Sequence, residues 1–180
     1  MIIPSFIGWR IKRTLKKRPS FKGTNSALSL CFICNVNEKD ALTALPSYIN
    51  SLKKRGKKVS LIAFYNGNRK SFEKEFPEAL PGIIVTRSDF NLFAGIKNNE
   101  VMDALEKSVD ILCNFDTSYT PITHMIASQS KAKFKVGTDL SETEIYDLVL
   151  DRKKDPTVIK YLQDFKEVMG NIFSNELSHS

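Results

Sequence analysis

The sequence predicts a three-layer α/β fold, in which a mostly parallel sheet is covered by helices on both faces. Short apolar runs of strand length alternate with segments of helical periodicity along most of the chain. The first run, residues 27–35, is apolar at almost every position, as expected of a strand covered on both sides. We therefore expect one Rossmann-like domain over residues 24–180, with right-handed crossovers between its strands.

Residues 1–23 predict a separate basic arm that forms a short amphipathic helix. Apolar side chains recur at every fourth position, at Ile3, Ile7, Ile11 and Leu15. The polar part of the arm carries seven cations: Arg10, Lys12, Arg13, Lys16, Lys17, Arg18 and Lys22. Pro19 and Gly23 then end the helix and begin a linker.

The first half of the domain is predicted as three strands and two helices. Residues 38–55 carry apolar side chains at helical spacing, and Gly56 is the stop signal after a basic last turn. Pro46 is expected to kink this helix. The other elements predicted here are strands at 27–35, 59–65 and 82–86 and a helix at 71–76, followed by a polar loop at 87–98.

The second half continues the same alternation. Asp155 and Pro156 predict the start of a long last helix, in which apolar residues recur at core spacing. The elements before it are predicted as helices at 99–107 and 120–130 and strands at 110–115, 133–136 and 146–150.

The charge distribution favours a polyanionic partner. The chain carries 27 Lys and Arg against 20 Asp and Glu, a net charge of +7. The seven arm cations, with no acid among residues 1–23, account for this excess, so the remainder is formally neutral. Such a segment attracts a nucleic acid or an anionic membrane surface, although a solvated helix face is the simpler interpretation.

The cysteines and histidines predict neither disulfides nor a metal site. Cys31, Cys34 and Cys113 all lie in apolar runs, and an odd number in so long a chain makes no disulfide framework. His124 has no second ligand at helical spacing, and His179 lies in the tail. No apolar window is long enough for a membrane span, so we predict a cytoplasmic protein without metal or cofactor.

Short polar residues follow the predicted strands and mark a candidate ligand crevice. Ligands of open α/β sheets bind beyond the carboxyl ends of the strands, near the switch in strand order. The residues expected there are Asn35, Asn37, Asp40, Asp116, Thr117 and Ser118. The same residue types also serve as helix caps and turns, and no complete catalytic set or nucleotide fingerprint accompanies them.

Several stretches resemble a family of short bacterial proteins of unknown function. They are residues 38–46, 88–95, 110–137 and 146–151. The chain also resembles, more distantly, the N-terminal half of heptosyltransferase-type glycosyltransferases, in which Asp40 would stand at the position of the proposed catalytic acid/base. Lys39 replaces the glycine that precedes that aspartate in the family, and the second domain, which holds the nucleotide sugar, is missing.

Three functions follow from these observations. The first is a non-catalytic binding module whose arm binds RNA or a ribonucleoprotein while the domain contacts a protein or the nucleic-acid backbone. The second is a peripheral membrane protein, since Phe6 and Trp9 lie beside the arm cations. The third is a glycosyltransferase-like enzyme or partner subunit. A fourth interpretation is that the apolar stripe of the arm packs on the domain.

Overall fold

The computed structural model describes residues 29–38, 40–76, 80–91, 95–138, 144–150 and 157–175. The predicted arm and its seven cations lie outside this part of the chain. The described residues form one sheet with all strand pairs parallel, in the order β3-β2-β1-β4-β5-β6. Its strands are β1 (Ser29–Asn35), β2 (Lys58–Tyr65), β3 (Ile83–Thr86), β4 (Ile111–Asn114), β5 (Phe134–Gly137) and β6 (Leu148–Val149).

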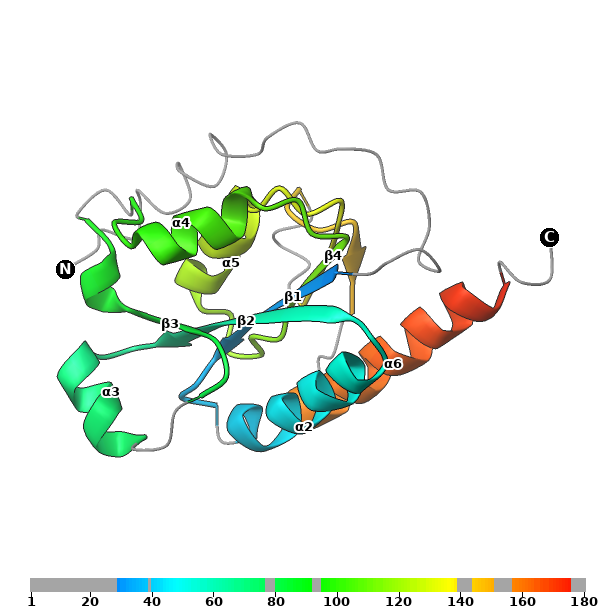
Figure 1. The fold of residues 1–180 in the computed structure, drawn as a ribbon, viewed down its shortest axis with the longest axis horizontal. Coiled ribbons are helices and arrows are strands. Elements are labelled where there is room, and N and C mark those ends of the chain that lie inside the picture. The colour runs from blue at the N-terminus through cyan, green and yellow to red at the C-terminus, as the bar shows by residue number, and fades with distance from the viewer. Residues whose placement is uncertain are drawn as a thin grey trace.

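Helices cover both faces of the sheet, which confirms the predicted three-layer α/β fold (Figure 1). The helices are α2 (Ala41–Lys54), α3 (Arg69–Glu75), η1 (Arg87–Asp89), α4 (Asn99–Glu106), α5 (Pro121–Gln129) and α6 (Val158–Asn175). Helices α2 and α6 lie side by side on one face, and α4 and α5 lie on the other. The five α-helices turn buried apolar side chains toward the sheet, as amphipathic spacing requires.

Strand β1 separates the two halves of the core. Phe32 and Cys34 belong to the apolar cluster under α2 and α6, whereas Cys31 and Ile33 belong to the cluster under α4 and α5. Successive side chains of a strand point to opposite faces, so a strand that is buried on both sides is apolar throughout. The predicted interpretation of the cysteines as buried thiols is confirmed, since all three are buried and free.

Some element boundaries differ from the predictions, for local reasons. Helix α2 begins at Ala41 and continues to Lys54 as one helix with Pro46 inside it. Strand β6 is shorter than the predicted 146–150, because Tyr146 turns its ring into the core and packs against Gly137. A Cβ atom at Gly137 would lie 2.4 Å from that ring, so only glycine allows this approach.

Candidate functional site

The carboxyl ends of β1 and β4 form the switch point of the sheet. From β1 the chain proceeds to β2 on one side, and β4 later returns to the other side of β1. Crevices of open α/β sheets lie at such points. The structure joins five of the six predicted crevice residues through hydrogen bonds: Asn35, the last residue of β1, and Asn37, Asp116, Thr117 and Ser118 in the loops after the two strands.

Asn35 and Asn37 join three loops at this end of the sheet. The Asn35 Nδ2 donates to Thr120 Oγ1 at 3.0 Å, which connects β1 to the start of α5. Its Oδ1 accepts the Asn37 N–H at 3.0 Å, and the Asn37 Oδ1 accepts the Asn66 N–H at 3.0 Å. The two amides therefore hold the loops after β1, β2 and β4 in a fixed relation.

Asp116 is a fully buried carboxylate at the N-terminus of α5. Its Oδ2 accepts the Thr120 N–H at 2.6 Å and the Thr123 hydroxyl at 2.5 Å. Its Oδ1 accepts the Ser118 N–H at 3.0 Å. A carboxylate at this position accepts hydrogen bonds from amides that the helix leaves unpaired, and the positive end of the helix dipole stabilises its negative charge. Asp116 thus ties the loop before α5 to Thr120, the N-cap residue of that helix, and to Thr123 in its first turn.

Glu38 contacts the same loop and was not among the predicted site residues. Its Oε1 accepts hydrogen bonds from the Thr117 N–H at 2.8 Å, the Ser118 N–H at 2.8 Å and the Ser118 hydroxyl at 2.7 Å. Its Oε2 is buried without a hydrogen-bond partner among the described residues. Burial raises the pKa of Glu38 to about 7, and the adjacent Asp116 carboxyl adds to this rise.

Asp40, which was predicted to lie in the crevice, binds the start of α6. Its Oδ2 accepts the Ile159 N–H at 2.9 Å, so the side chain caps the first turn of α6. Although Asp40 precedes Ala41 at the start of α2, it makes no side-chain cap to that helix. The position that the heptosyltransferase resemblance assigned to an acid/base is here a link between α2 and α6.

A buried hydrogen-bond chain extends from the switch point into the core. The Asn114 Nδ2 donates to the Tyr146 hydroxyl at 2.8 Å and to Thr123 Oγ1 at 3.4 Å. The Tyr146 hydroxyl lies 2.8 Å from His124 Nδ1. These hydrogen bonds connect Asp116 to His124 by way of Thr123, Asn114 and Tyr146. Sequence reasoning missed Asn114 and Tyr146, because nothing local distinguishes them from ordinary strand residues.

The side chains of this site can exchange a proton and hold the loops in place. Glu38 can gain or lose a proton near neutral pH, and the surrounding hydroxyl groups are held as hydrogen-bond donors. Within the described residues there is no group of three or more His, Cys, Asp or Glu side chains that could hold a metal ion. In the same part of the chain, no helix has the length and apolar character needed to cross a membrane.

A second polar region lies at the opposite, amino edge of the sheet. The turn between α2 and β2 carries five cations, Lys53, Lys54, Arg55, Lys57 and Lys58, and we call it the basic turn. All except Lys57, which is half-buried, are exposed. Gly56 adopts a φ of +77° and ends α2, with its N–H donating to Lys53 O and the Lys57 N–H to Leu52 O. The turn is thus a fixed structure.

Comparisons with solved structures agree with this fold. The chain is similar to a crystal structure of an exopolyphosphatase-related protein from Bacteroides fragilis, with 15% sequence identity and a TM-score of 0.52. The alignment covers 94% of this chain and 45% of that chain, so the present chain spans less than half the length of its neighbour. At this identity the likeness concerns the fold alone. The resemblance to heptosyltransferases is not confirmed by it.

Comparisons of sequence identify a family. Comparison with curated proteins gives no match. Residues 5–165 match the model of DUF6913, which is described as a family of unknown function. This agrees with the resemblance to a family without an assigned activity that the sequence motifs indicated. Because the matched residues include most of the chain, the protein belongs to the DUF6913 family.

Proposed function

We propose that this protein is a non-catalytic binding module for single-stranded RNA, and that the basic arm and the basic turn form one binding surface. The observation that carries the proposal is the position of the turn. Ser29, the first residue of β1, pairs in register with Lys58 of β2. The chain that leads from the arm into the domain therefore ends beside the basic turn.

The cations of the basic turn are suited to bind phosphates. Lys53, Lys54 and Arg55 are exposed at the end of α2, and none of them forms a salt bridge with a described residue. Cations that are not neutralised by neighbouring carboxylates release the counterions of a nucleic acid when they bind it. The arm contributes seven further cations and the whole basic turn five, which makes twelve positive charges for the proposed surface.

The switch-point site supports the non-catalytic part of the proposal. Asp116 is fully buried and accepts three hydrogen bonds from the chain itself. Asn35 is likewise bonded to Thr120 and Asn37. Side chains that satisfy one another in this way fix the loops, which is the role that the helix-capping interpretation gave them.

The aromatic residues of the arm favour RNA over polyphosphate. The similar solved structure is described as exopolyphosphatase-related, and inorganic polyphosphate, like RNA, is a chain of phosphates. Polyphosphate has no bases, however, whereas Phe6 and Trp9 offer rings on which bases stack. We therefore expect RNA to bind more tightly than polyphosphate of equal charge.

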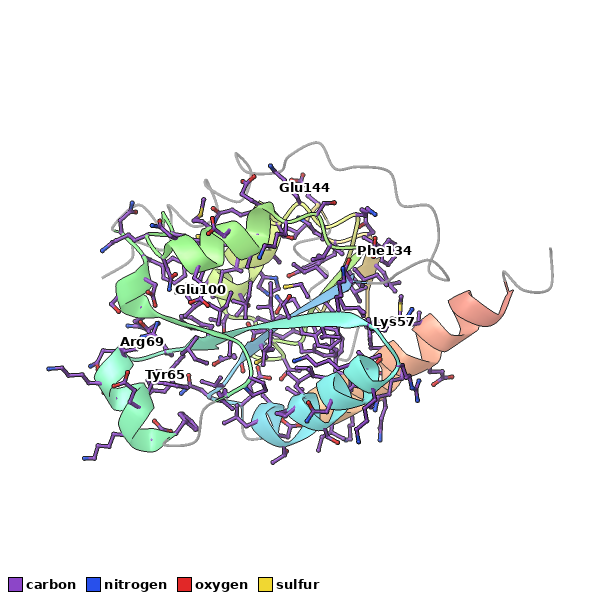
Figure 2. The ribbon with its side chains drawn as sticks, in the orientation of Figure 1. Lys57, Tyr65, Arg69, Glu100, Phe134 and Glu144 are labelled. Carbon is purple, nitrogen blue, oxygen red and sulfur yellow. The ribbon has the colours of Figure 1, made fainter. Side chains whose placement is uncertain are left out.

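The test is binding of a labelled single-stranded RNA to the full chain, measured by fluorescence anisotropy at low salt. The variant Lys53→Glu/Lys54→Glu is expected to weaken binding at least about tenfold, because two phosphate contacts become repulsive. Lys16→Glu/Lys17→Glu should weaken it similarly. The matched control is Lys70→Glu/Lys74→Glu on α3, where both lysines are exposed. Figure 2 shows Lys57, just before β2, and Arg69, the first residue of α3, at opposite ends of that strand.

The control separates a defined surface from a general charge effect. All three double variants change the net charge equally, so the proposed surface predicts that the basic-turn and arm variants lose affinity and the α3 variant does not. Equal losses in the basic-turn and α3 variants would refute the defined surface. If the protein floats with anionic vesicles and does not bind RNA, the ligand of this surface is a membrane. If it binds polyphosphate more tightly than RNA, the ligand is polyphosphate.

A further inference from the structure

A cavity of about 540 Å³ lies between α2, α6 and the amino ends of β1 and β4. Its inner wall is apolar and is formed by Leu30, Ile111, Phe165 and Met169, all of which are buried. The volume is in the range of cavities that bind small organic molecules. The cavity is distinct from the switch-point site, which lies at the other end of the strands.

The rim of the cavity is cationic. Arg55, Lys57 and Lys166 line it, and no Asp or Glu is among its lining residues. The Lys166 ammonium lies 4.6 Å from the centroid of the Tyr48 ring, so a cation–π contact holds this lysine on another lining residue. An apolar wall with only positive charges among the residues at its mouth is complementary to a molecule with an apolar body and an anionic head.

We propose that this cavity binds a small amphiphile with an aliphatic body and a single carboxylate. The aliphatic part would replace water against the four buried apolar side chains, which is favourable in proportion to the apolar area covered. The carboxylate would accept charge-assisted hydrogen bonds from Arg55 at the rim, for which a guanidinium has the matching geometry. The site shares Arg55 and Lys57 with the basic turn, but RNA phosphates gain nothing from the apolar wall, so the proposed occupant differs from RNA.

The test is calorimetric titration of the full chain with three probes of equal chain length, namely dodecanoate, dodecanol and dodecyltrimethylammonium. Dodecanoate is expected to bind about tenfold more tightly than dodecanol, because a hydrogen bond to a charged group is stronger than one to a neutral group. The cationic probe is expected to bind most weakly. The variant Arg55→Gln should remove most of the preference for dodecanoate and leave binding of dodecanol unchanged.

A second pair of variants tests the place of binding. Gly170 lines the cavity, is exposed, and has nothing within 4 Å of the position that a Cβ would occupy. Gly170→Trp is expected to fill the cavity and weaken dodecanoate binding at least tenfold, whereas Gly170→Ala should retain it. Thermal unfolding of both variants confirms that they fold, and unchanged RNA binding by Gly170→Trp separates this proposal from the previous one.

Three results would overturn the proposal. Equal affinities for the three probes would mean that the rim does not select a carboxylate. Dodecanoate binding that Gly170→Trp leaves unchanged would lie elsewhere on the protein. Binding that is absent in the natural chain and arises only in an Ile7→Ser/Ile11→Ser variant would assign the cavity to the apolar stripe of the arm.

Discussion

Tyr161 presents a polar atom that the core leaves unsatisfied. Its side chain is 1% exposed and packs edge to face on Phe115, with the ring centroids 5.4 Å apart. The hydroxyl has no hydrogen-bond partner among the described residues, and burial holds the pKa of Tyr161 well above its usual range. A buried hydroxyl without a partner loses its bonds to water and gains none in return.

Replacing Tyr161 by phenylalanine is therefore expected to leave the free energy of unfolding unchanged or to raise it by up to about 1 kcal/mol. The matched control is Tyr146→Phe, which removes a hydroxyl that bonds Asn114 and lies 2.8 Å from His124. That change should destabilise the protein by roughly 1–3 kcal/mol. Urea unfolding of both variants measures the difference, and a larger loss for Tyr161→Phe would contradict this account.

Glu38 links protonation to stability at the switch point. The ordinary pKa of its carboxyl is 4.5, and in the folded protein it is raised to about 7. The folded state thus binds this proton more tightly than the unfolded chain does. The stabilisation is complete below pH 4.5 and is lost as the pH rises to about 7.

The substitution Glu38→Gln keeps a neutral side chain of the same shape at every pH. The variant should match the natural protein at pH 4 to 5 and become the more stable of the two at about pH 8, where Glu38 is ionised. Chemical unfolding across this pH range measures the two curves. Glu73→Gln on α3, where the side chain is exposed, is the control and should show no such divergence. If the stability curves of Glu38→Gln and the natural protein ran parallel, the pKa of Glu38 would not be raised in the natural protein.

At the scale of single elements, helix ends show how the fold places its charges. Helix α5 has no basic residue in its last turn, and Lys135 of β5 supplies the missing cation. Its ammonium donates to Ala127 O at 2.7 Å and to Ser128 O at 3.3 Å, although the side chain is only 2% exposed. A cation at this position donates hydrogen bonds to the terminal carbonyls of the helix, and the negative end of the helix dipole stabilises its positive charge.

The end of α2 depends on one glycine, which also shapes the basic turn. Gly56 has a φ of +77°, and a Cβ there would meet nothing within 4 Å. Gly56→Ala should therefore destabilise the protein by about 1 kcal/mol through the backbone alone. Gly170→Ala inside α6 also has an open Cβ position and should instead stabilise it by roughly 0.5–1 kcal/mol. Thermal unfolding measures the change in stability of each variant. A change of the same sign in both would contradict the backbone strain assigned to Gly56.

At the scale of the whole molecule, the sequence predicted the order of the elements well, because buried parallel strands are apolar along their whole length. It also marked Asn35 and Asp116, since polar residues stand out directly after such strands. It could not reveal Glu38, whose partner Ser118 is 80 positions away along the chain. The sequence also did not predict the contact of Asp40 with Ile159, because that contact forms only when α6 packs against α2.

At the amino ends of the strands, too, local features can be read from the sequence, whereas contacts between distant segments cannot. The arm cations form a visible run in the sequence, and Lys53, Lys54 and Arg55 were noted only as the basic last turn of a helix. The register of Ser29 against Lys58 brings the first described residue after the arm to that turn. The proposed surface of two separate segments rests on this register, whereas the charge of each segment can be read from composition.

The salt dependence of RNA binding tests this composite surface most directly. The slope of the logarithm of the binding constant against the logarithm of the salt concentration should be steep for the natural chain. In Lys53→Gln/Lys54→Gln it should become shallower by roughly 1.4, from two contacts at roughly 0.7 each, and in Lys70→Gln/Lys74→Gln it should stay unchanged. A slope that is the same in all three proteins, or that is flat in the natural chain, would contradict RNA binding at the basic turn.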